Sequence, residues 1–242
     1  MKFTSTHKLS ASMVGSDESL SAIGAYQIVQ DTITEFMGEL KIDGVTVKRK
    51  YNAFWVFVKT RVKFCKKLYW GAKFVVEAYV SAMSAAKMHI DVRVNDENGT
   101  TVFCARTELC VLDIATQRIK KIASVGVDES MLMPSDAPEI NFGKFDAVEL
   151  PRVEQVKVRC TNVDHSHHTN NLEYLRFIMN TYSVEELETR TIREIEVVYA
   201  SQSYENDVLD VLKASCTDKD LIFLEKDGKP VVKCEILMGE NV

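Results

Sequence analysis

The chain has 242 residues, of which 46% are hydrophobic, and its 35 acidic and 30 basic side chains give a net charge of −5. This length allows a substantial core in one large domain or two small ones. The chain contains no apolar run near the roughly 18 residues of a membrane span, and its N-terminus lacks the apolar segment of a signal peptide, so we expect a cytoplasmic protein.

The first half reads as one long helix followed by strands. An extended stretch over residues 2–13 precedes Asp17 and Glu18, an acidic pair that is a plausible helix start. Apolar residues recur at helical spacing from residue 20 to residue 37, and Gly38 is a natural stop. Strand-like runs follow at residues 53–64, 74–83, 88–94 and 101–112, with an Asn98–Gly99 hairpin turn between the last two.

The second half repeats this order of elements. Residues 153–160 alternate as a strand does, and a helical pattern with one apolar face begins after Asn170 and Asn171 and extends to Tyr182. Further strand-like runs lie at residues 192–200, 208–212, 221–225 and 231–237, with an Asp227–Gly228 turn before the last.

Between the halves, a stretch rich in Pro, Asp, Ser and Gly has the composition of a surface connection. It contains Pro134, Pro138 and Pro151. We therefore expect an α+β protein with an N-terminal domain at 1–125, a linker at 126–151 and a C-terminal domain at 152–242. Each domain should be a long helix wrapped by an antiparallel sheet.

The six cysteines are dispersed and form no Cys-x-x-Cys pair. We interpret them as buried thiols of a reducing compartment, and we expect neither a disulfide framework nor a zinc site. The HSHH run at residues 165–168 is an alternative metal site, but no second His or Cys cluster completes it. No metal and no cofactor are expected. The cysteines are Cys65, Cys104, Cys110, Cys160, Cys216 and Cys234.

The junction before the second helix holds the candidate chemistry. Residues 163–174 read VDHSHHTNNLEY and include three of the five histidines. In an extended stretch, Asp164, Ser166 and His168 would point to one face. The helix start that follows offers backbone N–H groups and a partial positive charge suited to an oxyanion. A carboxylate, a hydroxyl and an imidazole at such a place are the ingredients of acyl-transfer hydrolysis.

The pattern D-x-N-x-H-x-N-N-x-x-Y resembles the signature of the acyl-acyl carrier protein (acyl-ACP) thioesterases, with Asp164, His168 and Tyr174 at matching positions. The likeness is that of a bacterial member to the plant-type enzymes, and it implies a tandem double hotdog fold. It extends along most of the chain. Further matching segments are Ser19–Leu20, Phe54–Trp55–Val56, Thr60–Arg61, Trp70–Gly71, Asn170–Asn171 and the stretch from Tyr199 to Ser203.

The chain departs from this pattern at two places. Ser166 stands where the pattern has Asn, and Gln202–Ser203 stands where the family places an acid or a cysteine, which excludes a cysteine nucleophile there. His168 is then the best general base, because an imidazole titrates near neutral pH. Asp164 would orient the imidazole, and Gln202 would place the water. Oxyanion stabilisation falls to Ser166 or to a backbone amide near Asn170 or Asn171.

Simpler interpretations exist for several of these residues. His165 and His167 alternate away from His168 and read as solvated bystanders. Asn170 and Asn171 could serve only as a helix cap, since Asn is among the best N-caps. Asp164 alone would be an ordinary turn residue.

A basic segment from Lys48 to Lys73 contains nine Lys or Arg residues and no acid. In a strand, Lys59, Arg61 and Lys63 share one face, a candidate docking surface for an acidic acyl carrier protein. The alternative is a solvated strand face whose lysines prevent edge pairing. Nucleic acid is not expected as a partner. By the resemblance, the acyl pocket lies against the first helix, with Trp55 and Phe57, or Phe36 and Met37, as lining.

The leading hypothesis is a thioesterase that releases fatty acid from acyl carrier protein. Its rivals are an acyl-CoA thioesterase and a non-catalytic acyl-binding hotdog protein, the latter suggested by Ser166 and Gln202. A double hotdog already contains the pairing that single hotdogs achieve by dimerising, so we expect a monomer or a homodimer.

Overall fold

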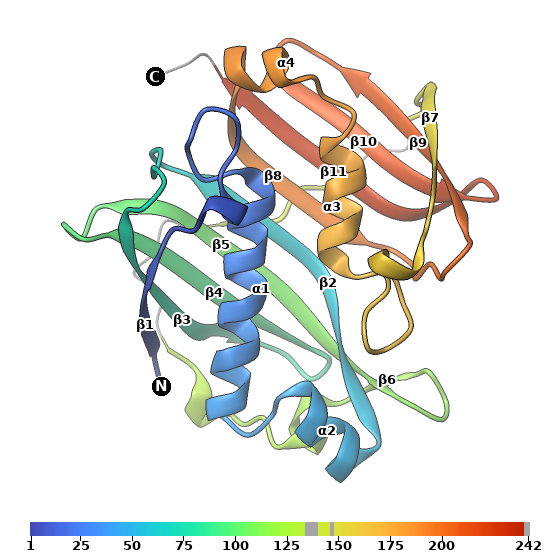
Figure 1. Ribbon diagram of the computed structural model, residues 1–242. Coiled ribbons are helices and arrows are strands. Elements are labelled where there is room, and N and C mark those ends of the chain that lie inside the picture. Colours follow the sequence, from blue (N-terminus) through green and yellow to red (C-terminus); the bar gives the residue numbers. More distant parts are fainter. Residues whose placement is uncertain (134–139, 146–147, 240–242) are drawn as a thin grey trace. The chain divides into compact units, whose positions relative to one another are not determined.

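A computed structural model describes residues 1–133, 140–145 and 148–239 (Figure 1). The chain divides into two compact units, Met1–Asn141 and Phe142–Val242. This division falls inside the predicted connection at 126–151, of which Pro134 and Pro138 lie outside the described residues.

Unit 1 is an antiparallel sheet with the strand order β1-β3-β4-β5-β2, and the short β6 pairs with the end of β5. The Asn98–Gly99 turn between β4 and β5 is confirmed, with Gly99 at φ 78° and its amide donating to the Asp96 carbonyl. The strands are β1 (Phe3–Lys8), β2 (Ala53–Phe64), β3 (Lys73–Met83), β4 (Lys87–Asp96), β5 (Thr101–Asp113) and β6 (Ile119–Lys120).

Helix α1 (Ala22–Glu39) packs against β3 and β4 on one face of this sheet (Figure 1). Two details of the predicted helix are wrong. The helix is capped by Ser21, whose hydroxyl accepts from the Gly24 amide, rather than by the acidic pair before it. It also continues through Gly38, and the left-handed residue that follows its end is Lys41, at φ 58°.

The rest of unit 1 contains short elements that the sequence pattern does not predict. Helix α2 (Gly44–Tyr51) is capped by Asp43, whose carboxylate accepts from the amides of Val45 and Thr46. The 3-10 helices are η1 (Ala11–Met13), η2 (Ile122–Val125) and η3 (Glu129–Met131). After η3, the Met133 amide donates to the Val80 carbonyl, which covers the edge of β3 beyond the end of β1.

Unit 2 repeats the topology of unit 1. Its strand order β7-β9-β10-β11-β8 is the order of unit 1 when the strands of each unit are counted from its start. The predicted repeat is therefore confirmed. The strands are β7 (Arg152–Lys157), β8 (Thr191–Tyr199), β9 (Val208–Ser215), β10 (Lys219–Lys226) and β11 (Lys229–Gly239).

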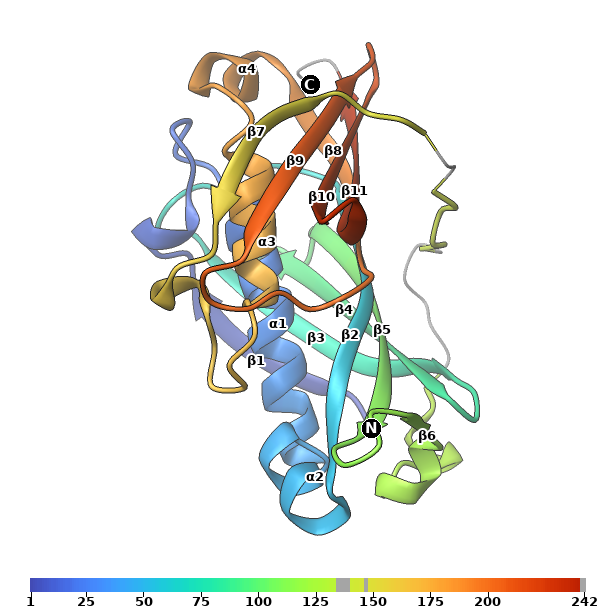
Figure 2. The same cartoon turned by 90° about the vertical axis from the view of Figure 1, so that its right-hand side faces the viewer.

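Helix α3 (Asn171–Met179) packs on β10 and lies to one side of the unit 2 sheet (Figure 2). The 3-10 helix η4 (Cys160–Asn162) precedes it, and the short α4 (Val184–Thr189) follows it. The predicted strand at 153–160 ends early, at Lys157. The Asp227–Gly228 turn is confirmed, because both residues have positive φ, 51° and 71°.

The interpretation of the cysteines as buried thiols holds for only half of them. Cys104, Cys110 and Cys234 are buried, and burial raises the pKa of the Cys104 thiol to about 11. Cys65 and Cys160 are exposed, as is Cys216. Among the described residues, no helix is both long and apolar enough to cross a membrane.

Candidate active site

The segment before α3 is a closed turn and not the extended strand that we expected. The Asp164 amide donates to the His168 carbonyl at 2.9 Å, and the His167 amide donates to the Asp164 carbonyl at 3.0 Å. Val163 and Thr169 form an antiparallel bridge at the base of this turn. His167 has φ 66°, the left-handed conformation that lets the chain reverse over so few residues.

The predicted convergence of three side chains nevertheless occurs within this turn. One carboxylate oxygen of Asp164, Oδ1, accepts from the Ser166 amide at 2.8 Å and from the Ser166 hydroxyl. The Ser166 Oγ lies 3.3 Å from Nδ1 of His168. The side chains therefore form a chain of polar contacts from carboxylate to hydroxyl to imidazole, and Ser166 is its middle member.

A second segment, residues 202–204, runs beside this turn. The Thr169 amide donates to the Ser203 carbonyl at 2.9 Å, next to His168. The ring of Tyr204 meets the His168 imidazole in a T-shaped arrangement, with centroids 5.1 Å apart and planes at 72°. Gln202, two residues before Tyr204, is exposed. The fold thus brings the predicted Gln202 region to the predicted histidine, across more than 30 residues of sequence.

Ser203 is not part of the exposed site. It is fully buried, with 0% exposure, and its hydroxyl lies 2.9 Å from the Tyr174 hydroxyl and 2.7 Å from the Thr169 hydroxyl. The Tyr174 hydroxyl also accepts from the Ser203 amide at 2.9 Å. Burial raises the pKa of Tyr174, so the phenol remains a neutral partner in this network. Tyr174, which the signature contains without a stated role, clamps the two segments together.

The two asparagines have different positions at the helix start. Asn170 is the N-cap of α3, and its side-chain oxygen accepts from the Leu172 amide at 2.9 Å. The backbone amide of Asn170 donates to the Asn162 carbonyl at 2.9 Å, so this amide already has an acceptor. Asn171 is the first residue of α3, and its amide belongs to the group that lacks intrahelical acceptors. Because the Asn170 amide already has an acceptor, the Asn171 amide is the candidate oxyanion donor of the two.

His165 and His167 are both exposed. Nowhere in residues 1–133, 140–145 and 148–239 do three or more His, Cys, Asp or Glu side chains gather in a way that could hold a metal ion.

Unit 1 contains a second copy of the same turn. The Gly15 amide donates to the Ser19 carbonyl at 2.8 Å, and the Glu18 amide donates to the Gly15 carbonyl. Glu18 has φ 60°. Val14 and Leu20 form the bridge at its base, and the Leu20 amide donates to the Leu68 carbonyl. Matching these bonds to those of unit 2 equates Ser19 with His168, and Asp17 with Ser166. The unit 1 turn therefore has no imidazole.

The basic residues of β2 occupy one sheet face of unit 1, as predicted, but they are not equally accessible. Lys59 and Arg61 are half-buried, whereas Lys63 is exposed. Lys59 is paired in register with Glu108, and the Arg61 guanidinium donates to the Asn141 carbonyl at 2.9 Å.

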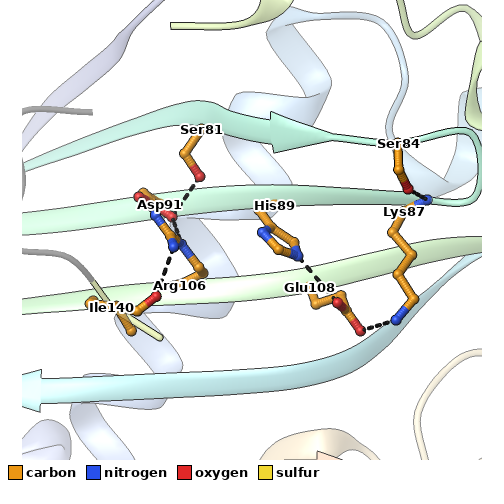
Figure 3. A network of polar contacts seen from close by, with 8 residues as sticks. All are labelled: Ser81, Ser84, Lys87, His89, Asp91, Arg106, Glu108 and Ile140. Carbon is orange, nitrogen blue, oxygen red and sulfur yellow. Dashed lines mark hydrogen bonds and ion pairs between the residues drawn. The ribbon is translucent and has the colours of Figure 1, made fainter. Parts of the chain in front are cut away.

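The neighbouring strands carry a polar network beside these cations (Figure 3). Arg106 makes two contacts of 2.7 Å with the Asp91 carboxylate and donates to the Ile140 carbonyl. Glu108 accepts from Lys87 at 2.8 Å and lies 3.2 Å from the His89 ring. Although burial opposes it, the Lys87 ammonium and the His89 ring hold the pKa of Glu108 below its usual range. This face is therefore organised by internal ion pairs and is not a uniform cationic patch.

Trp55 and Phe57 are paired in register with Val111 and Leu109, which are fully buried at 0% exposure. The Trp55 indole donates to the Ile42 carbonyl at 2.7 Å, after the end of α1. Both aromatic side chains remain partly accessible.

The fold and the site define a class: an α+β protein built from two copies of one helix-and-sheet unit, with a polar Asp–Ser–His chain at the helix start of the second copy. Residues 1–129 match the acyl-ACP thioesterase N-terminal domain, and residues 146–232 match the acyl-ACP thioesterase C-terminal domain. The chain belongs to the acyl-ACP thioesterase family.

The chain is also similar to curated and solved relatives. It is 20% identical over 185 residues to the chloroplastic oleoyl-acyl carrier protein thioesterase 1 of Arabidopsis thaliana, a match that covers 72% of this chain and 51% of the relative. The chain thus spans about half the length of the curated relatives it matches.

Solved structures extend the likeness to the whole fold. A crystal structure of an acyl-ACP thioesterase from Bacteroides thetaiotaomicron matches with a TM-score of 0.91 at 16% identity, over 98% of both chains. The 12:0-ACP thioesterase from Umbellularia californica matches with a TM-score of 0.86 at 18% identity, over 99% of this chain and 98% of that one. The predicted α+β tandem double hotdog fold is confirmed.

Proposed function

We propose that this protein is a thioesterase that hydrolyses fatty acyl-acyl carrier protein to free fatty acid and carrier, with His168 as the general base. The observation that carries this proposal is the contact chain from Asp164 through Ser166 to Nδ1 of His168, in a member of the acyl-ACP thioesterase family. A chain of this kind orients an imidazole for proton transfer.

The hydroxyl of Ser166 has one proton, which it donates in a hydrogen bond to the Asp164 carboxylate. The Ser166 oxygen then accepts a hydrogen bond, and the donor it faces is Nδ1–H of His168. This arrangement selects the tautomer with the lone pair on Nε2. Ser166 therefore acts through His168, and the oxyanion falls to another donor.

In the proposed reaction, Nε2 of His168 removes a proton from water as the water oxygen bonds to the thioester carbonyl carbon. The Asn171 amide at the start of α3 stabilises the developing oxyanion, and Gln202 helps to hold the water. The tetrahedral intermediate collapses with cleavage of the carbon–sulfur bond. His168 returns its proton to the leaving thiolate, so that one water yields a carboxylic acid and a carrier thiol.

The acidic carrier would dock by charge complementarity at the basic side chains of β2, with Lys63 as the exposed contact beside Lys59 and Arg61. Trp55 and Phe57 would line the acyl pocket. We also propose a cytoplasmic location, and a monomer or a homodimer as the assembly.

The decisive experiment measures thiol release from one acyl group on acyl carrier protein and on CoA, across chain lengths, with wild type and His168→Ala. We expect faster hydrolysis of the carrier-protein thioester and a loss of about 10²–10⁴-fold in kcat for the variant. Equal rates on the two carriers would favour an acyl-CoA thioesterase. No hydrolysis by the wild type, combined with binding of the thioester, would favour the non-catalytic acyl-binding alternative. Circular dichroism of the variant checks that it remains folded.

A further inference from the structure

Tyr204 contacts the imidazole of His168 from a segment distant in sequence. The two ring centroids are 5.1 Å apart and the planes meet at 72°. On another side of the imidazole, Nδ1 lies 3.3 Å from Ser166 Oγ. The histidine ring is thus held by a polar contact from its own turn and by an aromatic contact from a second segment.

The backbone of Tyr204 is fixed in place by a tight turn. Its amide donates to the Asp207 carboxylate at 2.9 Å, and the Asp207 amide donates to the Tyr204 carbonyl at 3.1 Å. Asp207 is in turn paired with Lys226 at 2.7 Å. The backbone amide of Asn206, a residue with φ 71°, donates to the Val158 carbonyl. The ring therefore projects from a rigid base.

Tyr204 is 48% exposed, so burial in the core does not account for an aromatic residue here. Within the described parts of the chain, its hydroxyl has no hydrogen-bond partner, and the ring contact of the side chain is with His168. Edge-to-face aromatic pairs are favourable beyond the area they bury. The ring, and not the hydroxyl, is what the site uses.

We propose that Tyr204 is a positioning residue for His168. Its ring restricts rotation of the imidazole, so that Nδ1 stays at Ser166 and Nε2 stays available to the water and the thioester. This inference rests on the proposed thioesterase function, which it deepens by adding a residue that acts through the base.

Unit 1 supplies a matched control. Tyr69 forms a backbone bridge with Ser19 in the unit 1 copy of the turn, and the residue is 56% exposed. Ser19 occupies the place of His168, so Tyr69 is the equivalent tyrosine without an imidazole beside it. Truncation of Tyr69 removes an exposed tyrosine from the same kind of turn and leaves the base untouched.

The test compares Tyr204→Ala, Tyr204→Phe and Tyr69→Ala in the full chain. For Tyr204→Ala on acyl carrier protein thioesters, we expect kcat to fall roughly three- to tenfold, the size of an aromatic pair contribution, with KM little changed. Tyr204→Phe, which keeps the ring, should restore kcat, and Tyr69→Ala should leave it unchanged.

Nitrogen-15 NMR of the histidine rings, with the His168 signal assigned from His168→Ala, gives a readout that needs no activity. Wild type should show a proton fixed on Nδ1 of His168, and Tyr204→Ala should show averaging of the two tautomers. An unchanged His168 signal together with unchanged kcat would overturn the proposal. A wild type that hydrolyses no thioester but shows the NMR difference would sink the proposed function while supporting the role of Tyr204.

Discussion

The Lys67 ammonium lies 2.8 Å from the Asp17 carboxylate in the unit 1 turn. Burial acts against ionisation, but Lys67 and Ser19 hold the pKa of Asp17 below its usual range. In unit 2, Ser166 occupies the position of Asp17. Gln202 occupies the position of Lys67, because Leu68 and Ser203 accept the equivalent backbone hydrogen bonds. In unit 1, the side chain at the position of Gln202 therefore reaches the turn. This contact supports our proposal that Gln202 lies beside the proposed catalytic residues.

Gln202→Ala should lower kcat roughly three- to tenfold, because a neutral hydrogen bond to the attacking water contributes about 0.5–1.5 kcal/mol. Steady-state kinetics on an acyl carrier protein thioester provides the measurement. Lys67→Ala is the control: it breaks the unit 1 ion pair and should alter stability without altering kcat. Equal kinetics for Gln202→Ala and wild type would remove Gln202 from the site.

Ser166→Ala interrupts the contact chain between Asp164 and His168. We expect kcat to fall by about three- to thirtyfold, since a hydrogen bond to an ionised carboxylate contributes more than one between neutral groups. Ser166→Asn, which introduces the residue of the family pattern, should retain more activity than Ser166→Ala. A Ser166→Ala enzyme with wild-type kcat at every pH would show that Asp164 serves only as a turn residue.

Tyr174→Phe should destabilise the protein by about 1–3 kcal/mol, because it leaves the buried Ser203 amide and hydroxyl without their shared partner. Urea unfolding gives the free energy difference. Tyr199→Phe is a suitable control, since the Tyr199 ring lies near that of Tyr174 but its hydroxyl has no hydrogen-bond partner in the described chain. A loss no larger for Tyr174→Phe than for Tyr199→Phe would argue against the clamp.

Asp43 at the start of α2 should contribute a pH-dependent part of the stability. The Thr46 hydroxyl and amide hold the pKa of this carboxyl below its usual value of 3.8. Because the folded-state pKa is lowered, the contribution is present above pH 3.8 and is lost as the pH falls through the folded-state pKa.

The matched pair for this prediction is Asp43→Ala and Asp43→Asn. At neutral pH, Asp43→Ala should reduce the unfolding free energy by about 1 kcal/mol, while Asn still caps the helix and loses less. Urea unfolding at decreasing pH should show wild type losing its advantage over Asp43→Asn below pH 3.8. A constant difference between these two proteins would contradict the assignment.

Lys63→Glu should raise KM for acyl carrier protein thioesters severalfold, and more at low ionic strength, because it reverses a charge on the proposed docking face. KM for the same acyl group on CoA should change less. Lys229→Glu makes the same charge change at the exposed first residue of β11 in unit 2 and should leave KM unaltered. Equal effects of the two substitutions would favour a general charge effect over docking.

The sequence by itself determined the repeated order of helix and strands, because hydrophobic periods of two and of 3.6 residues persist over long elements. Asn98–Gly99 and Asp227–Gly228 indicated the hairpins, because these residue types readily adopt the positive φ of tight turns. The short helices α2 and α4 were missed, since a helix of two turns offers too few positions to establish a period. The spacing of Asp164, Ser166 and His168 singled out the candidate site through its likeness to a family signature.

Only the tertiary structure decided how that site is built. The three side chains converge through a closed turn with His167 in the left-handed region, and not through the alternation of a strand. The contact of Tyr204 with His168 and the clamp of Ser203 by Tyr174 join segments about 30 residues apart. Such contacts leave no local period in a sequence, because they depend on which strands and loops the packed core places side by side.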